Sequence, residues 1–246
     1  MTFLEHLTEF RTRLMRSFIA LAAASVIGLV YCKKIFFILQ IPMLKALPEG
    51  SNFIATNPFE SYVTYFKVAF LAGIFLASPY LFFQLWRFIN PGLQTKEKKL
   101  LLPASLASAF LFVGGALFGY FVVFPAGFHY INLVLEGTAI RLMPSMSDYL
   151  SVASTLLLAF GVTFELPLFI FILGKFGLIQ YTHIRQYRRY VVVVLFIVAA
   201  ILTPGPDVLS QCLMAVPLWI LYEVGGLTLL MMKKNNEKHA EQTNPA

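Results

Sequence analysis

Charged residues are scarce in this sequence of 246 residues, and their scarcity excludes most classes of soluble protein. Only 13% of the residues are Asp, Glu, Lys or Arg, whereas 59% are hydrophobic and 25 are phenylalanine. Soluble domains carry roughly twice that share of charge, and long apolar stretches are typical of transmembrane helices. The short alternating segments of an outer-membrane barrel are absent. The chain is therefore predicted to be an all-α membrane protein.

Cysteine is also scarce, since the chain contains only Cys32 and Cys212. Both lie in or beside apolar segments, so neither a disulfide framework nor a metal site is expected. The sequence lacks a HExxH zinc motif, a P-loop, a GxSxG elbow and a pair of intramembrane aspartates. The four histidines all fall outside the apolar segments. These absences argue against an enzyme, and no cofactor or metal is expected.

Six apolar segments are predicted to cross the membrane, at residues 17–31, 62–86, 100–128, 149–174, 190–202 and 208–232. An extension of the first segment past Lys33 and Lys34, through the apolar residues 35–39, stays open. The fifth is short, about 20 Å of helix against a hydrocarbon core of about 30 Å, which leaves a re-entrant segment open. A tight turn at residues 203–207 follows it, and such a short hairpin requires a locally thinned bilayer or shelter by other protein. We predict one polytopic membrane domain over residues 1–234 and a disordered cytoplasmic tail over residues 235–246.

The distribution of Lys and Arg predicts the orientation. With six spans, 14 of the 19 basic residues fall on the side of the two termini and four on the other side, and Lys67 lies within the second span. Basic residues accumulate in cytoplasmic loops, so both termini are predicted to be cytoplasmic. The net charge of +7 follows from this bias and does not require nucleic-acid binding.

Two long loops, residues 32–61 and 129–148, are then predicted to face outward. The first contains Ile41-Pro42 and Asn57-Pro58, which favour turns over a continued helix. In the second, Ser147 and Asp148 are expected to cap the fourth transmembrane helix.

Glu165 lies in the middle of the fourth apolar segment, which is otherwise uncharged. A charged side chain at the bilayer centre costs about 2.5–3.5 kcal/mol on insertion scales, and such residues face the bundle interior or a wet cavity. Glu165 is therefore a candidate functional residue. The alternative is a protonated side chain that hydrogen-bonds to a neighbouring helix. Glu223 in the sixth segment also needs a partner, and its role stays open.

The N-terminal segment carries apolar residues along one helical face, which indicates an interfacial helix that leads into the first span. Glu9 and Arg13 are four residues apart on this helix. A surface ion pair at this spacing contributes only a few tenths of a kcal/mol. Glu97 lies among lysines in a predicted loop. On residue chemistry alone, both carboxylates are ordinary surface charges.

Four motifs, in order along the chain, resemble the TatC family, the polytopic subunit of the twin-arginine protein translocase. They are HLTEFRTRL from residue 6, SPYLFFQLWRFINPGLQTKEKK from residue 78, FGVTFELP around Glu165, and LTPGPDVLSQCLMAVPLWILYEVG from residue 202. The resemblance covers nearly the whole chain. It implies a non-enzymatic protein of the bacterial inner membrane that receives folded cargo proteins.

The resemblance implies that Glu9 and Glu97 bind the consecutive arginines of the cargo's signal peptide at the cytoplasmic face. A guanidinium binds a carboxylate through its planar fork, and a lysine cannot reproduce that geometry. Arg11 and Phe88 match neighbouring positions and are expected to shape the same patch.

The resemblance also implies contacts with single-span partner subunits of the TatA or TatB type. Glu165 would line a concave, membrane-embedded pocket of a bundle with short fifth and sixth helices. Gln211, Thr203 and Asp207 would form another contact region, and Pro42 matches a proline of the first outward loop. Membrane lipid and further copies of the chain are expected in a larger complex.

A different class of function is a proton-coupled secondary transporter with Glu165 as the proton carrier. Such folds show internal repeats and interrupted helices at corresponding positions of two halves. No convincing internal repeat is found here. An intramembrane protease would lack its nucleophile or metal pair. The receptor and the transporter differ in whether Glu165 or the pair Glu9 and Glu97 carries the activity.

Overall fold

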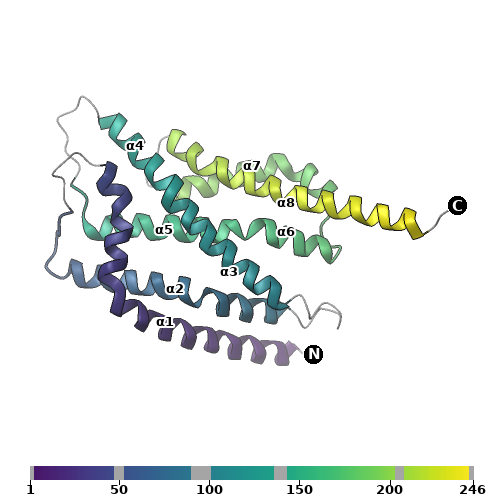
Figure 1. The fold of residues 1–246 in the computed structure, drawn as a ribbon, viewed down its shortest axis with the longest axis horizontal. Coiled ribbons are helices and arrows are strands. Elements are labelled where there is room, and N and C mark those ends of the chain that lie inside the picture. The colour runs from purple at the N-terminus through teal and green to yellow at the C-terminus, as the bar shows by residue number, and fades with distance from the viewer. Residues whose placement is uncertain (1–2, 47–52, 90–100, 136–142, 203–207, 244–246) are drawn as a thin grey trace. The chain divides into compact units, whose positions relative to one another are not determined.

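The computed structural model shows a helical chain, which confirms the predicted all-α class (Figure 1). It describes residues 3–46, 53–89, 101–135, 143–202 and 208–243. The elements are α1 (Phe3–Ala46), α2 (Glu60–Ile89), α3 (Leu101–Phe118), the π-helix η3 (Gly119–Val123), α4 (Phe124–Leu135), α5 (Met146–Phe164), α6 (Leu166–Lys175), α7 (Tyr181–Leu202) and α8 (Val208–Thr243). Within these ranges, β structure is limited to one isolated bridge between Ile54 and Ser145.

Five segments of the described chain are long and apolar enough to cross a membrane: Glu5–Lys45, Glu60–Ile89, Leu101–Val134, Met146–Lys175 and Gln211–Met232. The predicted multi-pass character is therefore confirmed. The remaining predicted span corresponds to α7, a helix of 22 residues that begins at Tyr181. Its first half carries three arginines, so the uncharged apolar part of the helix is limited to residues 190–202.

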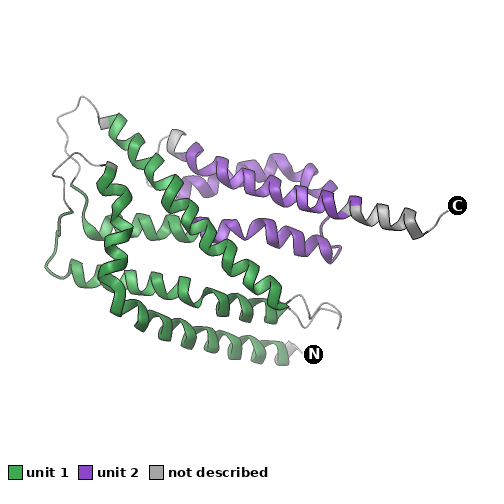
Figure 2. Ribbon diagram, viewed as in Figure 1, with its two compact units in different colours: residues 1–158 green, residues 159–246 purple. Residues whose placement is uncertain are grey.

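The chain divides into two compact units, Met1–Leu158 and Ala159–Ala246 (Figure 2). The boundary falls within α5. The predicted single membrane domain over residues 1–234 stays a prediction. The predicted tail over residues 235–246 also stays a prediction, and α8 is a helix to Thr243. Residues 235–243 include Glu, Lys, Ala and Gln, which are strong helix formers and extend the preceding apolar helix.

Two glycines bring α1 and α2 close together in the first unit. A Cβ atom added to Gly28 would lie 2.5 Å from the carbonyl oxygen of Ala69, and one added to Gly73 would lie 2.9 Å from the Cα of Ser25. Real Cβ contacts of this kind do not occur, so only glycine permits this spacing. Small residues of this kind let transmembrane helices pack closely.

The first predicted outward loop is wrong over residues 32–46, because α1 continues to Ala46 and contains Pro42. A proline within a helix leaves the carbonyl four residues earlier without its N–H partner. Here that carbonyl belongs to Ile38, and the hydroxyl of Tyr120 donates to it at 2.6 Å. The hydroxyl of Tyr149 donates to the next carbonyl, of Leu39. Pro42 is therefore a buried helical residue and not a loop residue.

We expect Tyr120→Phe to destabilise the first unit by about 1–3 kcal/mol, because the Ile38 carbonyl then loses a partner in an apolar setting. In a Pro42→Ala background the same change should cost much less, since the backbone N–H that this substitution introduces can restore the helical bond. Chemical unfolding in mixed micelles of the two single variants and the double variant measures this difference. An equal cost of Tyr120→Phe in both backgrounds would contradict this account of the Ile38 carbonyl.

The second predicted outward loop is shorter than expected, because α4 extends to Leu135 and α5 begins at Met146. The hydroxyl of Ser145 accepts a hydrogen bond from the backbone N–H of Asp148 at 3.0 Å, so Ser145 caps α5 in place of the predicted Ser147 and Asp148. The carboxylate of Glu60 adds a second cap, since its Oε1 accepts from the N–H of Ser147 at 2.8 Å. Its Oε2 accepts from the hydroxyl of Thr56 at 2.9 Å.

In the second unit, α6 and α7 both pack against α8. A Cβ atom added to Gly225 of α8 would lie 2.6 Å from the side chain of Ile170 in α6. The hydroxyl of Tyr222 donates to the carbonyl of Ile184 in α7 at 2.8 Å. The bond from Tyr222 holds the first half of α7 against α8.

Candidate functional site

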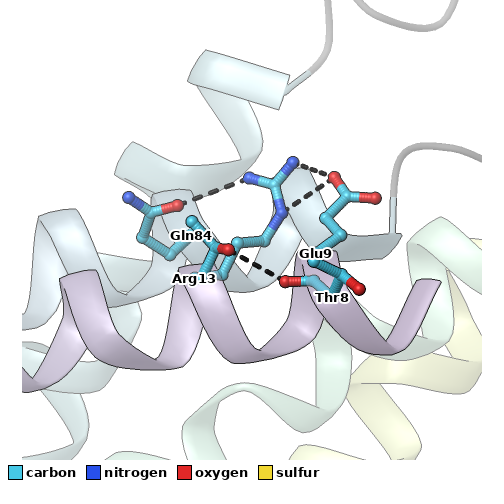
Figure 3. A network of polar contacts seen from close by, with 5 residues as sticks. Thr8, Glu9, Arg13 and Gln84 are labelled. Carbon is cyan, nitrogen blue, oxygen red and sulfur yellow. Dashed lines mark hydrogen bonds and ion pairs between the residues drawn. The ribbon is translucent and has the colours of Figure 1, made fainter. Parts of the chain in front are cut away.

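A polar network joins the start of α1 to the end of α2 (Figure 3). The guanidinium of Arg13 donates to Oε1 of Glu9 from Nε at 3.0 Å and also from Nη2. Its Nη1 donates to Oε1 of Gln84 at 3.4 Å. Gln84 in turn donates from Nε2 to the hydroxyl of Tyr80 at 2.6 Å. The position of Arg13, and through it that of Glu9, is thus fixed from α2.

This network is largely shielded from solvent. The side chains of Arg13 and Glu9 are 13% and 21% exposed, and Gln84 is only 4% exposed. An exposed ion pair contributes about 0–1 kcal/mol, whereas a shielded pair with a further hydrogen bond is held more firmly. The interpretation of Glu9 and Arg13 as an ordinary surface pair is therefore wrong.

Aromatic rings form one border of this region. Phe88 near the end of α2 stacks on His6, with ring centroids 4.6 Å apart. It also contacts Phe10 at a centroid distance of 5.4 Å. The structure thus brings two of the predicted site residues, Glu9 and Phe88, to the same ends of α1 and α2. Flat rings beside a carboxylate suit a planar guanidinium, which stacks on aromatic faces.

A cavity of about 440 Å³ opens beside Glu9 along α1. It is lined by Glu5, Thr8, Glu9, Thr12, Arg13 and Arg16. The hydroxyl of Thr12 donates to the carbonyl of Thr8 at 2.9 Å, which keeps this wall helical. Two carboxylates and two guanidiniums therefore border one polar cavity.

The other predicted residues of this site differ in what the structure describes. Arg11 lies on α1 and is exposed. Glu97 lies outside the described residues, as do Thr203 and Asp207. Their predicted roles stay predictions.

Glu165 is 3% exposed and lies at a break between α5 and α6. The predicted fourth span, residues 149–174, is therefore divided between two helices, α5 and α6. Pro167 stands in the first turn of α6, and its missing N–H interrupts the helical bonding. The backbone N–H of Glu165 instead donates to the carbonyl of Val162 at 3.1 Å. The break places the carboxylate at the N-terminus of α6, where the helix dipole favours negative charge.

Gln211 and Glu223 each bind a residue of α7. The Nε2 of Gln211 donates to the carbonyl of Phe196 at 2.9 Å. The carboxylate of Glu223 forms an ion pair with Arg188, with Oε1 2.6 Å from Nε. Gln211 thus joins the two helices of the last hairpin, and the open question about Glu223 has an answer in Arg188.

The sequence did not indicate Gln84, Glu60 or the two tyrosine hydroxyls that bind carbonyls of α1. Each acts on a residue far away along the chain, so no local pattern could reveal it. One signal was available, since a proline inside an apolar run requires a donor for a freed carbonyl. In the described part of the chain, no three His, Cys, Asp or Glu residues are placed to hold a metal ion.

Known proteins resemble this chain over most of its length. Residues 5–217 match the sequence profile of the family described as Sec-independent protein translocase protein (TatC). A TatC protein of Desulforapulum autotrophicum is 43% identical over 240 residues, which cover 98% of this chain and 88% of that protein. The TatC of Escherichia coli strain K12 is 37% identical over 221 residues, 89% of this chain and 84% of that protein.

A solved structure agrees with this result. The crystal structure of a "Twin Arginine Translocase Receptor- TatC" superimposes with a TM-score of 0.81 at 38% identity and covers 92% of this chain and 98% of that one. The proteins of this family are components of a protein translocase and not enzymes. The apolar helices, the match over most of the sequence and the shared fold together show that this chain belongs to the TatC family, the multi-pass membrane component of the Sec-independent protein translocase.

Proposed function

We propose that this chain is the receptor subunit that binds the arginine pair in the signal peptides of folded cargo, with Glu9 and Glu97 as the binding carboxylates. The observation that carries the proposal is the geometry at Glu9. Its carboxylate is held in a shielded polar region and already binds a guanidinium, that of Arg13. The solved relative described as a twin-arginine translocase receptor supports the same function.

The carboxylate of Glu9 has capacity for a second guanidinium. Arg13 uses Oε1 alone, and Oε2 points away from Arg13 (Figure 3). An ionised carboxylate offers about four lone-pair sites on its two oxygens. A peptide arginine can therefore bind Oε2 while Arg13 keeps the side chain in place. The adjacent cavity of about 440 Å³ gives room for its stem.

Two consecutive arginines need two acceptors. Glu97 supplies the second in this proposal, from the connection between α2 and α3. Phe88, stacked on His6, offers an aromatic face to a guanidinium. Arg11 is exposed on the same helix as Glu9. Its positive charge repels a peptide arginine that lies in the wrong register, and so it orients the incoming peptide.

The remaining predicted residues belong to assembly. Both termini lie in the cytoplasm, on the basis of the excess of Lys and Arg on one side. The family membership supports residence in the bacterial inner membrane. Glu165, Gln211, Thr203 and Asp207 contact single-span partner subunits of the TatA or TatB type, and several copies of the chain assemble.

The test measures binding of a peptide with consecutive arginines to the purified protein in detergent, with a lysine-pair peptide as the specificity control. We expect the arginine peptide to bind at least about tenfold more tightly than the lysine peptide. The reason is that a bidentate hydrogen bond of a guanidinium to a carboxylate is stronger than the point-charge attraction of a lysine. Glu97→Gln should reduce this preference, and Glu165→Gln should retain it. Equal binding of both peptides, with Glu165→Gln abolishing a proton flux in vesicles, would instead support the transporter.

A further inference from the structure

A groove between α7 and α8 has a basic end and apolar walls. Its volume is about 810 Å³, within the range of about 300–1,000 Å³ that is common for ligand sites. Arg185, Arg188 and Arg189 line one end. Further along, Val192 and Phe196 of α7 face Val216 of α8. We call this site the arginine groove.

Positive charge remains at the basic end after internal pairing. Arg188 pairs with Glu223 through Nε at 2.6 Å, which offsets one of the three positive charges but leaves the other N–H donors of this guanidinium for an anion. The guanidinium of Arg188 also lies 5.4 Å from the ring centre of Trp219. Arg189 contacts the hydroxyl and the ring of Tyr190, which are both neutral groups. The three arginines are exposed, so the groove carries a net excess of positive charge open to an anion.

The arginines also stand where the membrane begins along α7. Arg188, Arg189 and Tyr190 directly precede the apolar run of residues 191–202. Arg, Tyr and Trp side chains of this kind mark the boundary between headgroups and hydrocarbon. The apolar walls of the groove therefore continue from this boundary into the hydrocarbon, with Val216 49% exposed.

We propose that the arginine groove binds one anionic phospholipid. Arg188 and Arg189 hold the phosphate of the headgroup, and one acyl chain lies against Val192, Phe196 and Val216. Basic pockets between transmembrane helices are the known setting for such headgroups. A free phosphate would use the arginines but not the apolar walls, and an apolar partner helix would use the walls but not the arginines. A lipid uses both.

The test is native mass spectrometry of the full chain after incubation with equal amounts of phosphatidylglycerol and phosphatidylcholine. The wild type should retain phosphatidylglycerol preferentially. Arg188→Gln with Arg189→Gln should reduce that preference by about tenfold or more, since each basic side chain near an anionic headgroup contributes about fivefold. The matched control is Lys33→Gln with Lys34→Gln, which changes an adjacent exposed basic pair outside the groove. This control should leave the preference for phosphatidylglycerol unchanged.

Two further variants separate the contribution of the arginine charges from that of the apolar walls. Arg188→Lys with Arg189→Lys keeps the charge and should keep most of the preference, which would show that the loss of charge, and not substitution at these positions, reduces binding. Val216→Trp fills the exposed wall and should reduce retention of both lipids. The proposal is overturned if inorganic phosphate displaces the bound phosphatidylglycerol, or if both lipids bind equally in the wild type. These outcomes do not depend on signal-peptide binding, so they leave the proposed receptor function untouched.

Discussion

Glu9→Gln should weaken binding of an arginine-pair signal peptide by about 10- to 100-fold. A hydrogen bond to a charged group contributes about 1.5–3 kcal/mol, and the amide removes the charge while it keeps the shape. Arg13 still has an oxygen acceptor in the variant, so the end of α1 should remain folded. Isothermal titration of the purified protein with the peptide measures the change.

The control for this experiment is Asp148→Asn. It removes one negative charge from the first turn of α5 in the same unit, at an exposed position. Its peptide affinity should match that of the wild type. If Asp148→Asn weakened binding as much as Glu9→Gln, the peptide would respond to overall charge and not to a site at Glu9.

Gly73→Ala should destabilise the first unit by about 1–3 kcal/mol, the usual cost of adding volume to a packed interior. The new Cβ would lie 2.3 Å from Oγ of Ser25 and 2.9 Å from its Cα. The hydroxyl can rotate away, but the Cα belongs to the backbone of α1. The two longest helices of the unit must therefore separate. Chemical unfolding in mixed micelles measures the loss.

Gly114→Ala is the matched control, since it makes the same change in the interior of α3, another long apolar helix of the unit. No atom outside its own turn lies within 4 Å of the added Cβ. Alanine is about 1 kcal/mol better than glycine in a helix interior, so this variant should be neutral or slightly more stable. A loss as large as that of Gly73→Ala would mean that close packing of α1 on α2 is not the cause.

Apolar length predicted the membrane-spanning helices well, because the bilayer requires long apolar runs. It predicted their ends poorly. The adjacent Lys33 and Lys34 left the end of the first span open, and in the structure both are exposed side chains on a helix that continues past them. Pro42 suggested a loop, but Tyr120 binds the carbonyl that the proline frees. A contact between residues 82 positions apart leaves no local pattern.

At the candidate site too, the sequence predicted local features but not those that depend on distant contacts. Glu9 could be found through a motif, and its i,i+4 spacing to Arg13 predicted the ion pair. Its shielding could not be predicted, because it depends on Gln84 from the end of α2. Similarly, Glu165 was evident as a carboxylate in an apolar run. The helix break beside it results from Pro167, whose effect within a membrane helix depends on neighbouring contacts.

The most direct measurement is a double-mutant cycle between Glu9 and the arginines of the signal peptide. Wild type and Glu9→Gln are each titrated with the arginine-pair peptide and with peptides in which one arginine is replaced by glutamine. The account predicts a coupling of about 1–3 kcal/mol between Glu9 and one of the two arginines, as expected for a direct charge-assisted contact. Additive effects for both arginines would show that Glu9 does not contact the pair, and would contradict the receptor site proposed at α1.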